Sequence, residues 1–109
     1  MSNGDILYNP SKVEIQNHLL AHEQVHTIQQ GDNPEAWWQR YLTDIPFRLE
    51  QEIEAYAVQY RYVRDNFNNK ALKWFLDRIA SDLSSSMYGN IIGKWEAETK
   101  IRQISKVVR

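Results

Sequence analysis

The chain has 109 residues, no cysteine, and a net charge of −1 from 13 basic and 14 acidic side chains. Its length suits one domain, at residues 1–109, and the balanced charge favours neither a nucleic-acid partner nor an anionic membrane. The lack of cysteine excludes disulfides and thiolate metal sites. The sequence shows neither a signal-peptide pattern nor a long apolar run, so we expect a cytoplasmic protein.

The sequence pattern predicts a mainly α fold with at most one short N-terminal strand, at residues 6–8. Ser11 is the expected cap of a first helix that ends near Gln30, because an acidic side chain follows it by three residues. Asn33 and Pro34 are the expected cap and first residue of a short second helix.

The second half of the chain is also expected to be helical. Asp44 caps a predicted long helix at about 45–64, and an Asn-rich turn at 66–69 precedes a helix with apolar residues three and four apart. After a loop at 84–90 comes a tail helix from about residue 91, whose expected apolar side is Ile91, Trp95, Ile101, Ile104 and Val108.

The first predicted helix carries the spacing H-E-x-x-H, at His22, Glu23 and His26. Residues four apart lie one turn apart on one helix face, so both imidazoles can reach one metal ion. The intervening glutamate lies on the shoulder of that face, where it can act as a base for a metal-bound water. This motif is typical of a hydrolytic zinc site, and two ordinary surface histidines are the alternative.

A hydrolytic zinc ion needs a third protein ligand, which here is either His18 or a carboxylate. The long third helix offers three glutamates, and Glu52 is the one that falls within its apolar stripe, whereas Glu50 and Glu54 lie on its flank. A buried carboxylate needs a positive partner. That partner is either the metal or Arg48, one turn earlier on the same helix.

These segments resemble the gluzincin zinc metallopeptidases. The residues that carry the resemblance are Ala21–Thr27 and, 25 residues beyond Thr27, Glu52–Ala57. They are most similar to single-domain minigluzincins and to small zinc-peptidase-like proteins of bacteria and their phages. The resemblance implies a zincin-like helical fold in which the H-E-x-x-H helix packs on a "glutamate helix", with one zinc ion held by His22, His26 and Glu52.

The chain departs from that family pattern in two places. Tyr56 stands where the pattern has Asp or Asn, whose implied role is to orient a ligand histidine. Zincins also present an edge strand to an extended peptide, and only seventeen residues precede His18. We therefore expect weak or narrow peptidase activity.

If the site is catalytic, Glu23 is the expected general base and acid. Tyr88, in a loop next to a glycine, is the expected donor to the oxyanion; Tyr60, Arg48 and His18 are its rivals. The function predicted is a zinc metallopeptidase acting on a peptide or protein. The alternatives are a non-catalytic, zinc-stabilised interaction module of a phage or bacterial complex and an all-α protein without metal.

Overall fold

The computed structural model describes residues 12–107, and there the predicted mainly α fold is confirmed. Five α-helices and one short 3₁₀-helix follow one another, and these residues contain no strand. The predicted strand at 6–8 and the cap at Ser11 lie outside the described residues. The elements are α1 (Lys12–Gln30), α2 (Pro34–Thr43), α3 (Ile45–Asn66), α4 (Asn69–Leu83), η2 (Ser86–Tyr88) and α5 (Lys94–Ser105).

Side-chain caps set three of the helix boundaries. The side chains of Asn33, Asp44 and Asn68 each accept a hydrogen bond from the backbone N–H three residues later, at 3.1, 3.0 and 2.8 Å. Such bonds satisfy amides that have no partner within the first turn of a helix. The first two caps and Pro34 at the start of α2 stand where the sequence predicts them, and α3 continues two residues beyond the predicted end, to Asn66.

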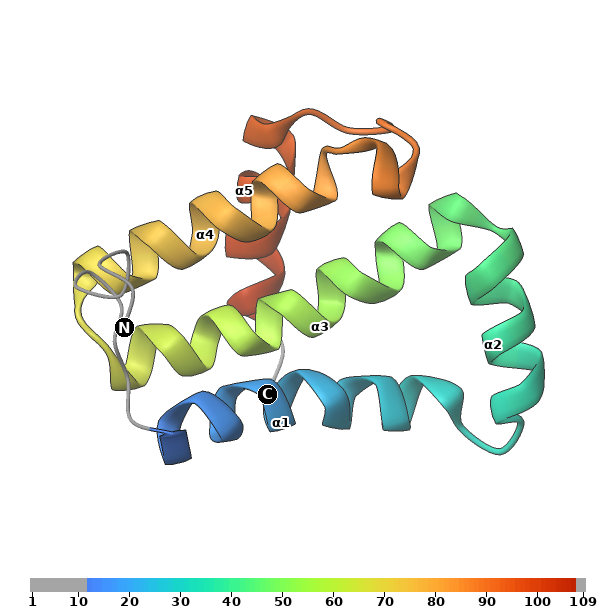
Figure 1. Ribbon diagram of the computed structural model, residues 1–109, viewed down its shortest axis with the longest axis horizontal. Helices are drawn as coiled ribbons and strands as arrows, with labels where there is room; N and C mark the ends of the chain where they lie inside the picture. Colours follow the sequence, from blue (N-terminus) through green and yellow to red (C-terminus); the bar gives the residue numbers. More distant parts are fainter. Residues whose placement is uncertain (1–11, 108–109) are drawn as a thin grey trace.

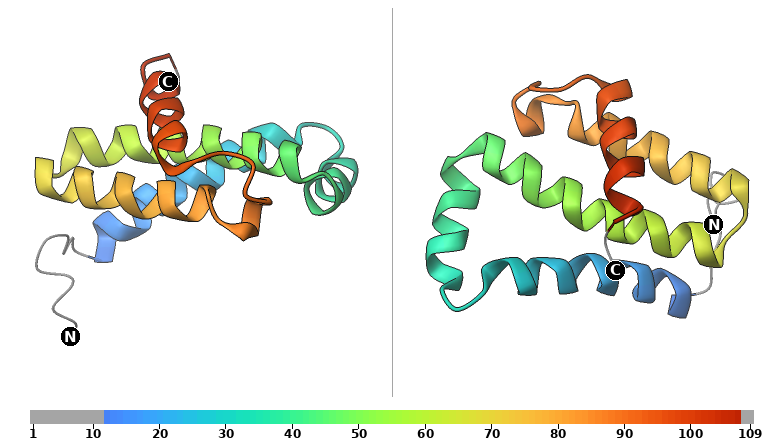
Figure 2. Two further views of the ribbon diagram at one scale, coloured as in Figure 1. Left: turned by 90° about the horizontal axis from the view of Figure 1, so that it is seen from above. Right: turned by 180° about the vertical axis from the view of Figure 1, so that it is seen from behind.

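Helix α3 is the central element of the fold. Helix α1 runs antiparallel to it along one side, α4 lies along the other side, and α2 joins α1 to α3 at one end (Figure 1). Helix α5 crosses α3 and α4 on one face of this arrangement (Figure 2). None of the described helices is long and apolar enough to cross a membrane.

The apolar core lies between α3, α4, η2 and α5. From residue 17 onward, where the side chains are described, α1 contributes none of its apolar residues: Leu19 and Leu20 are 49% and 53% exposed. Its buried side chains there are instead three histidines. The core consists of Leu49, Ile53, Tyr60, Val63, Phe75, Leu76, Ile79, Ala80, Leu83, Tyr88, Ala97 and Ile101.

The predicted apolar side of the tail helix is partly wrong. Ile101 is fully buried and Ile104 packs against the core, but Trp95 is 75% exposed. Six residues separate Trp95 from Ile101, which turns the two side chains about 120° apart on a helix. Ile91 is also exposed because it precedes the first residue of α5, and Val108 lies outside the described residues.

Candidate metal centre

The structure brings His22, His26 and Glu52 together between α1 and α3. The two histidines are buried one turn apart on α1, and Glu52 comes from the facing side of α3, where it is 7% exposed. The Nε2 atoms of His22 and His26 lie 3.2 Å apart, and Glu52 Oε1 lies 3.0 and 3.2 Å from them. Glu50 and Glu54 are exposed, as the stripe on the third helix predicts.

These three atoms fit a tetrahedral zinc ion. Zinc bonds of about 2.0–2.1 Å at tetrahedral angles place neighbouring ligand atoms about 3.3 Å apart, close to the separations observed here. Two imidazoles and one carboxylate are also a donor set found in hydrolytic zinc sites. A single buried carboxylate surrounded by imidazole nitrogens therefore has the geometry and the chemistry of a divalent-cation site.

Glu52 is held from both sides in its ionised form. The hydroxyl of Tyr41, on α2, donates a short hydrogen bond to Glu52 Oε2, so Oε1 alone faces the histidines. Burial raises the pKa of Glu52, but hydrogen bonds from His22, His26 and Tyr41 outweigh burial and keep this pKa well below its usual range. Burial and the neighbouring carboxylate raise the pKa of Tyr41, which therefore remains a donor.

Arg48 does not form the ion pair with Glu52 that the sequence left open. Its guanidinium donates instead to the backbone carbonyls of Tyr41 and Leu42, at 2.9 and 3.1 Å, and to that of Met87 at 3.3 Å. Arg48 thus fastens the end of α2 to α3 and to η2. The negative charge of Glu52 is stabilised by the residues that hydrogen-bond to Oε1 and Oε2 rather than by this arginine.

His18 is not one of the converging ligands, although it lies one turn before His22. It is 5% exposed, and its Nδ1 accepts a hydrogen bond of 2.7 Å from the side-chain amide of Gln59. The same amide accepts a hydrogen bond from His22 Nδ1 through its oxygen, at 3.0 Å. Burial lowers the pKa of His18, which favours its neutral form.

His26 has a corresponding amide partner. Its Nδ1 donates to Gln29 Oε1 at 2.8 Å, and the Gln29 amide nitrogen donates to the backbone carbonyl of Gln51 and to Glu54 at 3.0 and 2.7 Å. Burial lowers the pKa of His26, but hydrogen bonds with Glu52 and Gln29 and the charge of Glu52 outweigh burial, so the pKa is raised above its ordinary 6.5.

Glu23 lies on the solvent-exposed flank of the histidine pair. Its negative charge is the last of several causes that raise the pKa of His26. Successive residues of a helix are turned by about 100°, so Glu23 and Ala21 lie on opposite flanks of His22. The exposed carboxylate is therefore free to meet a molecule that approaches from its own side.

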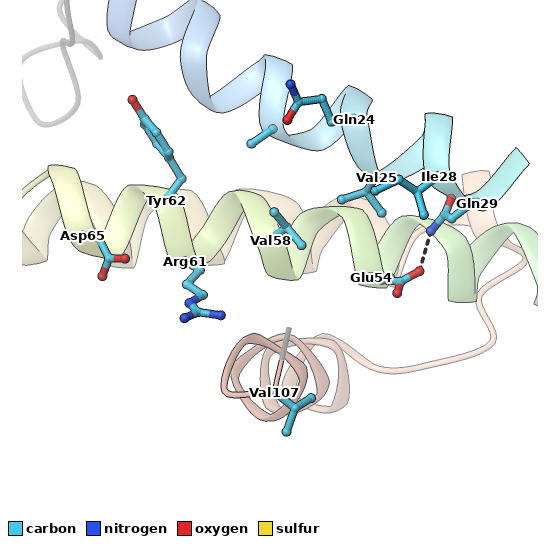
Figure 3. A pocket seen from close by; sticks show the side chains of 11 residues that line it. Gln24, Val25, Ile28, Gln29, Glu54, Val58, Arg61, Tyr62, Asp65 and Val107 are labelled. Atoms are coloured by element: carbon cyan, nitrogen blue, oxygen red, sulfur yellow. Dashed lines mark hydrogen bonds between the residues drawn. The ribbon is translucent and has the colours of Figure 1, made fainter. Parts of the chain in front are cut away.

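A groove of about 730 Å³ lies on the other flank, between α1, α3 and the residues that follow α5 (Figure 3). Ala21, Val25, Val58, Arg61 and Val107 are among its lining residues. None of the three candidate ligands lines it. A molecule in this groove would thus be on the opposite side of the histidine pair from Glu23.

Besides Tyr41, two tyrosines lie near the candidate centre. Tyr88 is buried in η2, and burial followed by the charge of Glu52 raises the pKa of its hydroxyl. The ring of Tyr56 meets that of His22 edge to face, with centroids 4.5 Å apart, and burial raises its pKa to about 12. Tyr60 lies in the apolar core. Among the described residues, none of these three hydroxyls is hydrogen-bonded to a candidate ligand.

The sequence prediction missed three residues that contact the ligands. Gln59 follows Glu52 by seven residues and Gln29 follows His26 by three, so helical spacing alone places both on ligand-bearing faces. Tyr41 gives no such signal, because its contact depends on how α2 is placed where it joins the ends of α1 and α3 (Figure 1).

Comparison of the chain with protein-family models, with curated proteins and with solved structures finds no match.

Proposed function

We propose that the chain is a zinc-dependent metallopeptidase of gluzincin type that cleaves a peptide or protein. The observation that carries the proposal is the convergence of His22, His26 and Glu52 within hydrogen-bond distance of one another. A carboxylate that is not a ligand, Glu23, stands on the same helix beside them. A site that serves only to stabilise a fold has no need of that carboxylate.

Zinc bound to these ligands would supply Lewis acidity that brings the pKa of a coordinated water towards about 7. Glu23 would accept the proton of the attacking water and pass it to the leaving amine; its exposed position next to His22 in the chain supports this role. Tyr41 keeps Glu52 in its ionised form by donating to the oxygen that faces away from the histidines.

Tyr88 remains the expected donor to the oxygen that gains charge during attack on a carbonyl. Its raised pKa keeps the hydroxyl protonated at neutral pH, and it lies within electrostatic range of both Glu52 and Tyr56. Arg48 is a weaker candidate than the sequence indicated, because its guanidinium is engaged by three backbone carbonyls. Tyr60 belongs to the same apolar core as Tyr88.

The described residues hold no edge strand to which an extended peptide could add. We therefore propose weak or narrow activity, directed at a preferred sequence rather than at unfolded proteins in general. A substrate bound without strand pairing depends on side-chain contacts for its register.

Metal analysis and one substitution test this function. Purified protein should hold one zinc ion per chain, and a peptide library should contain members that it cleaves. Glu23→Gln preserves the size of the side chain and the three ligands but removes the proton acceptor. This variant should keep its zinc and lose about 10²–10⁴-fold in turnover.

Glu50→Gln is the matched control, since Glu50 is an exposed glutamate of α3 outside the ligand set. It should change neither the zinc content nor the turnover. A zinc-loaded wild-type protein that cleaves no library member, and whose partner binding is unaffected by Glu23→Gln, would contradict the peptidase proposal.

That result would favour a zinc-stabilised interaction module. One observation supports this second function: the buried side chains of the described part of α1 are histidines, and none of its apolar residues belongs to the core. Metal bound at such a place would hold two helices together whether or not it took part in a reaction.

A further inference from the structure

The side-chain amide of Gln59 joins two histidines of α1. Its oxygen lies 3.0 Å from His22 Nδ1 and its nitrogen lies 2.7 Å from His18 Nδ1. Gln59 is 3% exposed and His18 is also buried, so water does not compete freely for these bonds. The three residues form a continuous hydrogen-bonded relay that ends at a candidate ligand.

This relay determines which nitrogen of His22 carries hydrogen. An amide oxygen can only accept a hydrogen bond, so His22 must carry its hydrogen on Nδ1. With hydrogen on Nδ1, the neutral ring leaves on Nε2 the unshared electron pair that a metal ion needs; a hydrogen that Nε2 donates to Glu52 in the metal-free protein is a second one, which the metal would displace. The opposite tautomer would place a hydrogen on the atom that has to bind metal.

His18 determines the orientation of the amide. If the Gln59 side chain were flipped, its NH₂ group would face His22 Nδ1 and favour hydrogen on Nε2. The acceptor at His18 Nδ1 holds the NH₂ group on the other side. Tyr56 does not provide an alternative constraint of this kind, because it meets His22 through the edge of its ring.

We propose that Gln59, oriented by His18, is a positioning residue that holds His22 as its Nδ1–H tautomer and thereby raises the affinity for zinc. The proposal rests on the zinc site of the proposed function but does not require peptidase activity. Polar partners of this kind typically change metal affinity by about 10–100-fold.

Zinc affinity in three variants tests the proposal, measured by competition with a chromophoric chelator. Gln59→Leu removes the acceptor and should weaken zinc binding by about 10–100-fold. Gln59→Glu keeps an acceptor for His22 and should bind zinc at least as tightly as wild type. His18→Leu removes the group that orients the amide and should give a smaller loss than Gln59→Leu.

Gln51→Leu is the matched control. Gln51 lies on the same helix, is partly buried, and its side chain also makes one hydrogen bond, from Trp37 at 2.7 Å, but contacts no ligand. The Gln51→Leu substitution should leave zinc affinity within about twofold of wild type. A Gln59→Leu variant that binds zinc as tightly as this control would overturn the proposal.

A second measurement needs no variant and no metal. Nitrogen-15 NMR of the metal-free wild-type protein at neutral pH should show His22 with hydrogen on Nδ1, as in its Nδ1–H tautomer, rather than on Nε2 alone. An Nε2–H tautomer overturns the relay even if zinc binds. Failure of the wild type to bind zinc, with His22 as the Nδ1–H tautomer, would instead refute the zinc site and retain the relay.

Discussion

The hydroxyl of Tyr41 holds the Glu52 oxygen that faces away from the histidines. We predict that Tyr41→Phe weakens zinc binding by about tenfold. A buried carboxylate that loses a hydrogen-bond donor is less stable in its ionised form, which is the form that binds zinc. Competition with a chelator measures the change. Tyr88→Phe is the control, because it also removes a phenol oxygen but from a tyrosine that makes no hydrogen bond to Glu52 among the described residues. This variant should keep the zinc affinity of the wild type and lose turnover. Equal affinities in the two variants would contradict the role given to Tyr41.

The raised pKa of His26 predicts how zinc stabilisation depends on pH. In the metal-free protein, protonated His26 stabilises the fold fully below its unfolded pKa of about 6.5, and this contribution is lost as pH rises through the raised value. Zinc must displace that proton, whereas Glu52, with its lowered pKa, stays ionised. The rise in melting temperature caused by zinc should therefore be largest above the raised pKa and shrink as pH falls towards 6.

Melting curves with and without zinc between pH 6 and 8.5 measure this dependence. His18 has a lowered pKa and is not a ligand, so it adds no proton competition in this range. A zinc effect that is constant across the range would show that no ligand proton is displaced.

At the scale of elements, α1 differs from the other helices in how it is attached. From residue 17 onward its buried side chains are His18, His22 and His26, whereas α3, α4 and α5 share apolar residues. Burial of apolar surface contributes roughly 25 cal/mol per Å², and polar contacts between buried groups contribute little net free energy. The attachment of α1 to α3 should thus depend on bound metal more than any other helix contact.

We predict that removing zinc with a chelator detaches α1 from α3 before it affects the core. At a thousandfold excess over its Kd, zinc stabilises the folded state by about 4 kcal/mol, so removing it should lower the melting temperature by at least about 10 °C. Hydrogen exchange should show the amides of α1 losing protection while those of α4 and α5 keep theirs. An unchanged melting curve, or a loss of protection spread evenly over all helices, would contradict this prediction.

Much of the candidate site follows from the sequence because it depends on single helices. The spacing of His22 and His26 and the place of Glu52 in an apolar stripe are local patterns, and the structure brings the three side chains together with Glu52 buried. Gln59 also lies on the ligand-bearing face, but a glutamine in a helix gives no chemical signal until its partner is known. Whether Tyr88 donates to a substrate stays a prediction.

At the scale of the whole molecule, the helix boundaries were predictable where a capping residue marks them, as at Asn33 and Asp44. What the sequence could not provide was how the helices cross. The contact of Tyr41 with Glu52 depends on how α2 meets α3 (Figure 1), whereas the exposure of Trp95 follows from its offset from Ile101 around α5. Amphipathic periodicity identifies a buried face but not the partner that covers it.

The contact of α1 with α3 is lined by histidines and contributes no α1 residue to the apolar core, and this has a consequence for the rates of folding and unfolding. His22 and Glu52 are 30 residues apart in the chain, whereas the core helices α3 and α4 follow one another directly. Contacts close in sequence form early in folding, whereas distant ones often form after the main barrier. Interactions that are absent at that barrier slow unfolding and leave the folding rate unchanged. Stopped-flow traces should therefore show zinc lengthening the lifetime of the native state without making the chain fold faster.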